Sequence, residues 1–169
     1  MAKLQLEPWN TVVLSGIGCS SRLPGYVETF GFNGVHGRAL TLAMGVKVAR
    51  PELNVIAVGG DGDGIAIGGN HFLHAARRNL DVAYFLMDNE IYGLTKGQAA
   101  PTTPAGDKTK STFWGNPEPS GRSLRACDLV RRDVGRPRVL GRPEDADRAD
   151  DAGDGAPRVR VPECPVAVA

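Results

Sequence analysis

The feature that most constrains this 169-residue sequence is the glycine-rich stretch GGDGDGIAIGG at 59–69, which directly follows an apolar run. That run, NVIAV at 54–58, has the length and composition of a buried strand. The spacing of apolar residues predicts a helix over 65–79, whose N-terminus would suit a phosphate. The strand delivers Asp61 to the carboxyl edge of a parallel sheet, where α/β proteins bind ligands. Flanking glycines let the backbone approach such a ligand closely.

Other apolar segments extend this pattern in both directions along the chain. TVVL at 11–14 and VAYFLM at 82–87 predict two more buried strands, and the spacing within 37–50 predicts a helix that stops before Pro51. The order strand, helix, strand, helix, strand indicates an α/β fold. It predicts an open parallel sheet with right-handed crossovers and helices on both faces. We expect residues 1–119 to form this domain.

The composition changes sharply near residue 120. Ten of the fifteen arginines follow Ser120, no lysine follows Lys110 and no aromatic residue follows Trp114. With little apolar surface to offset chain entropy, residues 120–169 are expected to form a poorly ordered tail. A GC-rich reading frame translated out of register gives the same composition, so we hypothesise that the tail is frameshift-derived. A natural disordered tail is the alternative, and sequencing the coding DNA distinguishes the two.

Charge and hydropathy exclude several classes of protein. The formal net charge of +1 gives no electrostatic reason to bind nucleic acid or an anionic membrane. No apolar run is long enough to span a bilayer, and the start, MAKLQLEPWN, lacks the apolar core of a signal peptide. The prediction is therefore a cytoplasmic protein with neither nucleic-acid nor membrane partners. The three widely spaced cysteines predict no disulfide framework and no self-contained metal site.

The end of the third predicted strand completes a candidate metal site. Asn89 follows Asp61 by 28 residues, which is enough for one helix and one strand, so the two side chains should lie at adjacent strand ends. A carboxylate and an amide oxygen suit Mg²⁺, which prefers six oxygen ligands. A diphosphate would add two oxygens, and the Ile91 carbonyl with water could complete the set. A dinucleotide site is the competing hypothesis, but Asp61 and Asp63 stand where its pyrophosphate would approach.

Residues 8–119 resemble the thiamine-diphosphate-binding domain of the β subunit of 2-oxoacid:ferredoxin oxidoreductases, in particular the 2-oxoglutarate-type enzymes. The motifs that carry the resemblance are SGIGCSSRLP (15–24), HGRAL (36–40), GGDGDGIAIGGNHFLHAARRN (59–79) and DNEIYGLTKGQAAPTTP (88–104).

The resemblance implies specific roles for residues in these motifs. Asp61, Asn89 and the Ile91 carbonyl would bind Mg²⁺. Lys96 would face the substrate as a catalytic residue, where a cation helps to bind the carboxylate of a 2-oxoacid. The residues expected to line thiamine diphosphate are Ile17, Gly18, Cys19, Ser20, His36, Gly62, Asp63, Gly93 and Leu94.

Cys19 has a second implied role. In the family this cysteine is one of four that hold a [4Fe–4S] cluster, with one pair in an upstream CPGC-type motif and the fourth downstream. This sequence begins after the position of that pair, and neither Cys127 nor Cys164 matches a family position. The iron–sulfur ligand set is therefore incomplete here, and we expect Cys19 to be a buried free thiol.

The resemblance also implies a reaction and partners. The reaction is oxidative decarboxylation of a 2-oxoacid such as 2-oxoglutarate to acyl-CoA, with coenzyme A as acyl acceptor and ferredoxin as electron acceptor. In the family the glutamate that activates the aminopyrimidine belongs to the α subunit, so an αβ assembly is implied. Three alternatives stay open: a non-redox thiamine diphosphate decarboxylase or synthase, a simple nucleotide-binding module, and a non-catalytic fragment.

Overall fold

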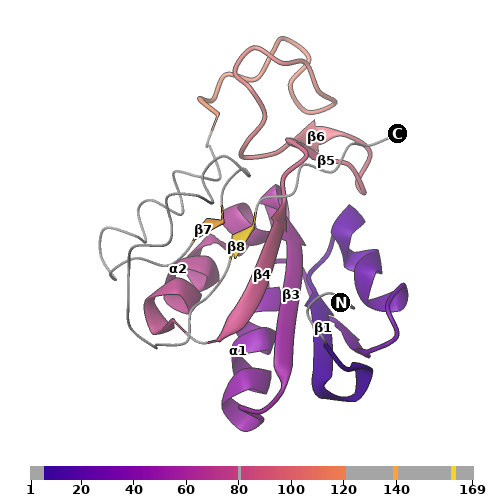
Figure 1. Ribbon diagram of the computed structural model, residues 1–169. Helices are drawn as coiled ribbons and strands as arrows, with labels where there is room; N and C mark the ends of the chain where they lie inside the picture. Colours follow the sequence, from indigo (N-terminus) through magenta and orange to yellow (C-terminus); the bar gives the residue numbers. More distant parts are fainter. Residues whose placement is uncertain (1–5, 80, 121–138, 141–160, 163–169) are drawn as a thin grey trace.

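The computed structural model describes residues 6–79 and 81–120, together with the backbone of 139–140 and 161–162. One four-stranded sheet organises the fold, in the order β2-β1-β3-β4, and every neighbouring pair is parallel (Figure 1). The strands are β1 (Thr11–Ser15), β2 (Phe30–Asn33), β3 (Asn54–Gly60) and β4 (Val82–Met87). The predicted α/β class with a parallel sheet is confirmed.

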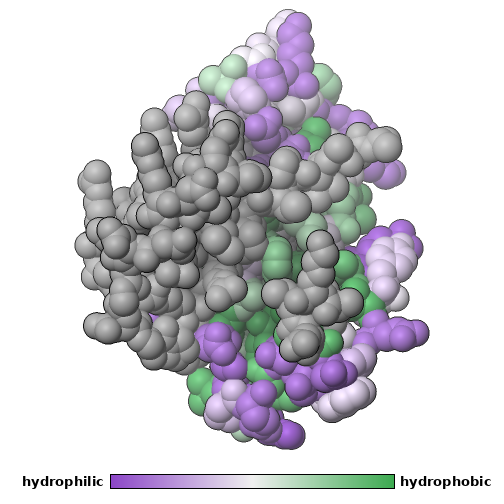
Figure 2. Space-filling view, viewed as in Figure 1, coloured by the Kyte–Doolittle hydropathy of each residue, from purple (hydrophilic) through white to green (hydrophobic). Residues whose placement is uncertain are grey.

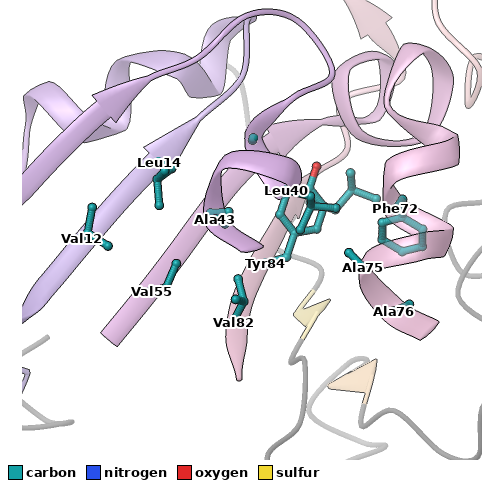
Figure 3. Packing of buried hydrophobic residues seen from close by; sticks show 13 residues of the cluster. Val12, Leu14, Leu40, Ala43, Val55, Phe72, Ala75, Ala76, Val82 and Tyr84 are labelled. Atoms are coloured by element: carbon teal, nitrogen blue, oxygen red, sulfur yellow. The ribbon is translucent and has the colours of Figure 1, made fainter. Parts of the chain in front are cut away.

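The hydrophobic core lies on one face of this sheet, beneath two α-helices. These helices are α1 (Ala39–Ala49) and α2 (Gly69–Arg78), and they pack against each other as well as against the strands. Alternate strand residues point toward them because side chains along a strand alternate between the two faces (Figure 3). The cluster comprises Val12, Leu14, Ala39, Leu40, Ala43, Val55, Ala57, Phe72, Ala75, Ala76, Val82, Tyr84 and Leu86.

A short 3-10 helix covers part of the opposite face. This helix, η3 (Cys19–Gly25), contacts β1, β2 and β3. A Cβ added to Gly31 in β2 would lie 2.9 Å from the Pro24 carbonyl oxygen, so a glycine is needed where η3 crosses this strand. Helices thus lie on both faces of the sheet in the described residues, as expected, but the two helices predicted from the sequence share one face and η3, on the other face, was not predicted.

Strand β2 was not predicted from the sequence. Its four residues, FGFN, are all exposed at the edge of the sheet, so no buried apolar run marks them. The strand is held instead by its parallel pairing with β1 and by a hydrogen bond from the buried Ser15 hydroxyl to Asn33 Oδ1, at 2.9 Å.

The second predicted helix differs at its start. Residues Gly62–Ile67 form a π-helix, η4, and α2 begins only at Gly69, whereas an uninterrupted helix over 65–79 was expected. The Gly68 amide donates to the Asp63 carbonyl, and a Cβ at Gly68 would lie 2.4 Å from that oxygen. This wide turn is the physical reason for the difference, and π-turns of this kind are frequent at functional sites.

After β4 the chain leaves the main sheet. Strands β5 (Ile91–Tyr92) and β6 (Gln98–Ala99) form a small antiparallel hairpin, followed by an irregular loop over 100–120. Asn116 ties this loop together, accepting from the Gly106 amide and donating to the Asp107 carbonyl, both at 2.8 Å. Figure 2 shows mostly hydrophilic residues at the top of the molecule, where Figure 1 places this loop.

Two short strands lie within the predicted tail. They are β7 (Val139–Leu140) and β8 (Val161–Pro162), which pair in parallel, and β8 contacts β4. The remainder of 121–169 lies outside the described residues, and with it the expectation of a poorly ordered or frameshift-derived tail. Among the described helices, none has both the length and the apolar character required to cross a membrane.

Candidate functional site

A pocket of about 330 Å³ opens at the carboxyl ends of β1, β3 and β4. This is the edge at which open parallel sheets bind ligands, and the volume falls within the usual range of ligand pockets. The residues that line it are Ile17, Gly18, Cys19, Ser20, His36, Gly60, Asp61, Gly62, Asp63, Met87, Asn89, Ile91, Tyr92, Gly93, Leu94 and Thr95.

Asp61 stands at the floor of this pocket, one residue beyond β3. It is only 2% exposed, and its Oδ2 accepts a hydrogen bond from the Thr102 hydroxyl at 2.7 Å. The same hydroxyl lies 2.8 Å from Asp88 Oδ1, so its single proton is shared between two carboxylates. Burial raises the pKa of Asp61, the charge of Asp88 raises it further, and the Thr102 hydrogen bond opposes the increase. The negative charge at Asp61 is therefore poorly compensated.

Asn89 lies beside Asp61 at the end of the neighbouring strand. Strands β3 and β4 pair in parallel up to Gly60 and Met87, so their continuations enter the pocket together. Asn89 Oδ1 accepts weakly from the Ile91 amide, at 3.4 Å, which closes a tight turn. Between them Glu90 adopts a left-handed φ of 59°. The structure thus gathers Asp61, Asn89 and Ile91 around one pocket, and their role as magnesium ligands stays a prediction.

Asp63 has a different environment from Asp61, although both follow β3. Its Oδ1 accepts from the Gly37 amide at 2.7 Å and from the Ile17 amide at 3.0 Å. His36 Nδ1 lies 2.9 Å from the same oxygen and 3.1 Å from the Ile17 carbonyl. Both neighbours are acceptors, so Nδ1 carries a proton. Asp63 is 3% exposed and joins the turns after β1 and β2 to the turn after β3.

The other oxygen of Asp63 is enclosed. Oδ2 has no hydrogen-bond partner among the described residues. A Cβ added to Gly16 would lie 2.1 Å from it, and one added to Gly59 would lie 2.7 Å from it. The carboxylate therefore packs closely against the backbones of Gly16 and Gly59.

Two glycine-containing turns face each other across the pocket. A Cβ at Gly93 would lie 3.2 Å from Cys19 Sγ, so the turn that contains Ile17, Gly18, Cys19 and Ser20 approaches the turn of Gly93 and Leu94. The prediction that Cys19 is buried is wrong, because its thiol is free and exposed at the start of η3. Exposure follows from its place at the pocket wall rather than beneath the sheet.

Lys96 is the predicted site residue that does not line the pocket. It is exposed in the β5–β6 turn, where it has a φ of 81° and its amide donates to the Gly93 carbonyl at 3.0 Å. Its catalytic role stays a prediction.

Three residues of the site were not singled out from the sequence. The ring of Tyr92 covers Gly62, and burial, followed by the charges of Asp61 and Asp63, raises the pKa of its phenol. Thr102 and Thr103 belong to the loop after β6, and their hydroxyls hydrogen-bond to the Asp61 carboxylate and to the Glu90 carbonyl, respectively. The motif DNEIYGLTKGQAAPTTP contains all three, but no spacing rule indicates which of its polar residues turn inward.

The pocket fits a magnesium ion bound to a diphosphate. Asp61, Asn89 and the Ile91 backbone supply hard oxygen donors, the kind that Mg²⁺ selects. The raised pKa of Asp61 marks a carboxylate that lacks a positive partner, and a cation in the pocket would supply one. Gly60 brings backbone to the wall without a side chain, which leaves room for phosphate groups, whereas the ring of Tyr92 fills the space beside Gly62.

Comparison with known proteins adds an independent finding. Residues 16–133 match the family model described as thiamine pyrophosphate enzyme, C-terminal TPP binding domain. Over 116 residues the chain is 56% identical to the 2-oxoglutarate synthase subunit KorB of Archaeoglobus fulgidus, covering 69% of this chain and 43% of that protein. It is 53% identical to the 2-oxoglutarate oxidoreductase subunit KorB of Mycobacterium tuberculosis, covering 69% of this chain and 31% of that protein.

A solved structure has a similar fold. The 2-oxoglutarate:ferredoxin oxidoreductase from Magnetococcus marinus, with 2-oxoglutarate, coenzyme A and succinyl-CoA bound, superposes with a TM-score of 0.80 at 40% identity. The match covers 96% of this chain and 56% of that chain. The present chain thus spans less than half the length of the two sequence relatives and about half of the structural one.

Proposed function

This chain belongs to the family of thiamine pyrophosphate enzymes, in their C-terminal TPP-binding domain, and we propose that it acts within the β subunit of a 2-oxoacid:ferredoxin oxidoreductase. The observation that carries the proposal is the convergence of Asp61, Asn89 and Ile91 on one pocket at the carboxyl edge of the sheet. The identity of 56% to an archaeal 2-oxoglutarate synthase subunit supports the reaction class. The substrate would be a 2-oxoacid such as 2-oxoglutarate.

We propose that the pocket binds Mg²⁺ together with the diphosphate of thiamine diphosphate. The Asp61 carboxylate, the Asn89 amide oxygen and the Ile91 carbonyl would hold the metal. When bound, thiamine diphosphate supplies the nucleophile and the electron sink for decarboxylation of a 2-oxoacid. The chain positions the cofactor through the turns at 17–20, 62–63 and 93–94 and through His36, all of which line the pocket.

Two further roles are proposed at the pocket mouth. Lys96, exposed in the β5–β6 turn, would pair with the carboxylate of the 2-oxoacid substrate. Cys19, exposed at the pocket wall, would supply one of the four thiolates that a [4Fe–4S] cluster requires. The other three would have to come from outside the described residues.

Activity would require partners. The α subunit of the oxidoreductase and ferredoxin are proposed because similar proteins are named as subunits of 2-oxoglutarate and 2-oxoacid:ferredoxin oxidoreductases, and coenzyme A is proposed from the solved relative. The solved relative is named with coenzyme A and succinyl-CoA bound.

Thermal unfolding with Mg²⁺ and thiamine diphosphate tests the cofactor proposal. Ligand at one hundred times its Kd should stabilise the parent by about 2.7 kcal/mol, a rise in Tm of roughly 5–10 °C. Asp61→Ala should show no ligand-induced rise, because the metal loses its carboxylate. Asp107→Ala, which removes an exposed carboxylate in the loop after β6, should respond like the parent.

Two outcomes would contradict the proposal. A parent chain that gains no stability from Mg²⁺ and thiamine diphosphate does not bind them as proposed. Stabilisation by NADH alone would favour a nucleotide-binding module instead. A holoenzyme assembled with its partner subunits that decarboxylates a 2-oxoacid without reducing ferredoxin would indicate the non-redox class of thiamine diphosphate enzyme.

A further inference from the structure

Two neighbouring buried threonines contact the segments that carry the proposed magnesium ligands. Thr102 and Thr103, here called the threonine pair, are 3% and 2% exposed and belong to the loop after β6. The predicted magnesium ligands belong to other segments, at the ends of β3 and β4. Buried hydroxyls need hydrogen-bond partners, so the groups that they contact show what the pair holds in place.

Thr102 hydrogen-bonds to the carboxylate of Asp61, the residue that follows β3. Its hydroxyl lies 2.7 Å from Asp61 Oδ2 and 2.8 Å from Asp88 Oδ1. These contacts reach both strand ends at once, because Asp61 follows β3 and Asp88 follows β4. The hydrogen bond to Oδ2 restricts rotation of the Asp61 carboxylate and so also orients its other oxygen, Oδ1.

Thr103 acts on the turn that carries the other two predicted ligands. Its hydroxyl donates to the carbonyl of Glu90 and accepts from the Ala100 amide at 2.8 Å. Glu90 is the residue with the left-handed φ of 59°, between Asn89 and Ile91. A non-glycine residue in that conformation is strained unless its surroundings hold it, and the Thr103 hydrogen bond does so.

The backbone of the pair is itself fixed. Ser120 Oγ donates to the Thr102 carbonyl at 2.7 Å, and Asn116 Nδ2 donates to the Thr103 carbonyl at 2.9 Å. Asn116 is buried and also closes the loop through Gly106 and Asp107. The loop after β6 is therefore a scaffold that presents two hydroxyls at fixed positions.

We propose that Thr102 and Thr103 are positioning residues for the metal site: they do not bind the metal, but they hold its ligands in place through hydrogen bonds. Thr102 fixes the rotation of the Asp61 carboxylate, while Thr103 fixes the turn that presents Asn89 and the Ile91 carbonyl. The inference rests on the proposed Mg²⁺–diphosphate function. Its physical basis is that Mg²⁺ demands near-ideal octahedral geometry, so small errors in ligand orientation weaken its binding.

Calorimetric titration of Mg²⁺ into the full chain at saturating thiamine diphosphate tests the proposal. Thr102→Val keeps the shape but removes the hydroxyl, and it should weaken Mg²⁺ binding by about 10- to 100-fold. Thr102→Ser restores the hydroxyl and should bind within about threefold of the parent, on the same principle. Thr103→Val should weaken binding in the same direction by releasing the Glu90 carbonyl.

Thr11→Val is the matched control. Thr11 is fully buried, and its hydroxyl donates to the Glu7 carbonyl at 2.8 Å, but it begins β1 at the opposite end of the sheet. Its loss should leave the Kd for Mg²⁺ unchanged. A loss of Mg²⁺ affinity in this control as large as in Thr102→Val would overturn the proposal, because it would reflect general loosening of the fold.

Replacing Mg²⁺ with Ca²⁺ separates positioning from general damage to the pocket. Ca²⁺ accepts irregular geometry and more ligands, so misplaced oxygens should cost it less affinity than they cost Mg²⁺. We expect the preference for Mg²⁺ over Ca²⁺ to fall in Thr102→Val and to return in Thr102→Ser. Equal losses for the two cations would overturn the positioning role.

The remaining outcomes are also decisive. If the parent binds Mg²⁺ and thiamine diphosphate and Thr102→Val binds Mg²⁺ within twofold of it, the proposed function stands and the inference fails. If the parent binds neither, both fail. Should Thr102→Val not fold, Thr102→Cys replaces it in the comparison with Thr102→Ser, because a thiol is a much weaker donor than a hydroxyl. Equal Mg²⁺ affinity in the Thr102→Ser and Thr102→Cys variants would then contradict the inference.

Discussion

Gly62 packs against the ring of Tyr92 so closely that a Cβ on the glycine would lie 2.1 Å from Tyr92 Cε1. The Tyr92 hydroxyl also lies 3.4 Å from the Gly62 carbonyl. This contact joins the turn after β3 to strand β5. It therefore sets the distance between these two segments, which both line the pocket. Any side chain at position 62 must displace the ring or the turn.

Gly62→Ala should therefore damage both stability and cofactor binding. Overpacking of a well-filled site costs about 1–3 kcal/mol, and displacement of Tyr92 moves the neighbouring Ile91 carbonyl, a proposed metal ligand. We expect a lower midpoint in urea unfolding and a Kd for Mg²⁺–thiamine diphosphate raised at least tenfold.

Gly45→Ala is the control for that substitution. Gly45 is exposed in the middle of α1, and a Cβ there meets nothing within 4 Å. Alanine should stabilise the helix by about 1 kcal/mol, because glycine is a poor helix former. If Gly62→Ala were as stable as Gly45→Ala and bound cofactor normally, the tight contact with Tyr92 would have no structural importance.

Asp63 is expected to matter more for the framework of the pocket than for direct contact with the cofactor. Asp63→Ala leaves the buried amide of Gly37 and the partly buried amide of Ile17 without their acceptor, and loss of the partner of a buried donor costs about 1–3 kcal/mol. We expect a loss of roughly 2–5 kcal/mol in urea unfolding, whereas Asp107→Ala, on the exposed loop, should change stability by less than about 0.5 kcal/mol.

A double-mutant cycle measures how far His36 depends on Asp63. Their 2.9 Å contact predicts a coupling free energy between His36→Ala and Asp63→Ala within the range of about 0.5–3 kcal/mol found for contacting residues. A coupling of zero in urea unfolding would show that His36 is not held by Asp63.

The sequence predicted the sheet and its functional edge well because both depend on local patterns. NVIAV and VAYFLM are buried apolar runs long enough to be strands, and their parallel pairing follows from the helix between them. Asp61 and Asn89 therefore had to emerge side by side. Such reasoning needs only strand length, connection length and the handedness of the crossover.

What the sequence did not predict depends on contacts between distant segments. Asp63 reaches residues 17 and 37, and Thr102 reaches residue 61, through hydrogen bonds that no periodicity encodes. Edge strand β2 has no buried face and so shows no apolar alternation. The exposure of Cys19 likewise depends on where η3 lies relative to the pocket rather than on its neighbours in the sequence.

Removal of residues 121–169 tests the predicted domain boundary. All residues that line the pocket, and the threonine pair behind it, lie between 17 and 103, and Ser120, which anchors the pair, is retained. We expect the shortened chain to bind Mg²⁺–thiamine diphosphate with a Kd within about threefold of the parent. Its Tm should fall by a few degrees, about 2–4 °C for each kcal/mol lost, because β8 contacts β4. Loss of binding would place part of the site beyond residue 120.

The buried carboxylate of Asp61, which the metal would need, is predicted to lower the stability of the protein when no metal is bound. Burial and the nearby Asp88 raise the pKa of Asp61 above its ordinary value of 3.8, so the folded protein favours the protonated form more than the unfolded chain does. Stability falls as pH rises from the unfolded-state pKa of Asp61 to its folded-state pKa, because the folded protein resists ionisation of this carboxyl. Asp61→Asn removes the charge but keeps the shape.

In metal-free buffer at pH 7, Asp61→Asn should therefore unfold at a higher temperature than the parent, by about 2–4 °C for each kcal/mol recovered. The difference should shrink on acidification and vanish near about pH 3, where the carboxyl of the parent is largely protonated in both the folded and the unfolded state. Mg²⁺ with thiamine diphosphate should reverse the order at pH 7, because only the parent retains the carboxylate. Differential scanning calorimetry at about pH 3, 5.5 and 7 measures all three, and a variant less stable than the parent at pH 7 without metal would contradict the prediction.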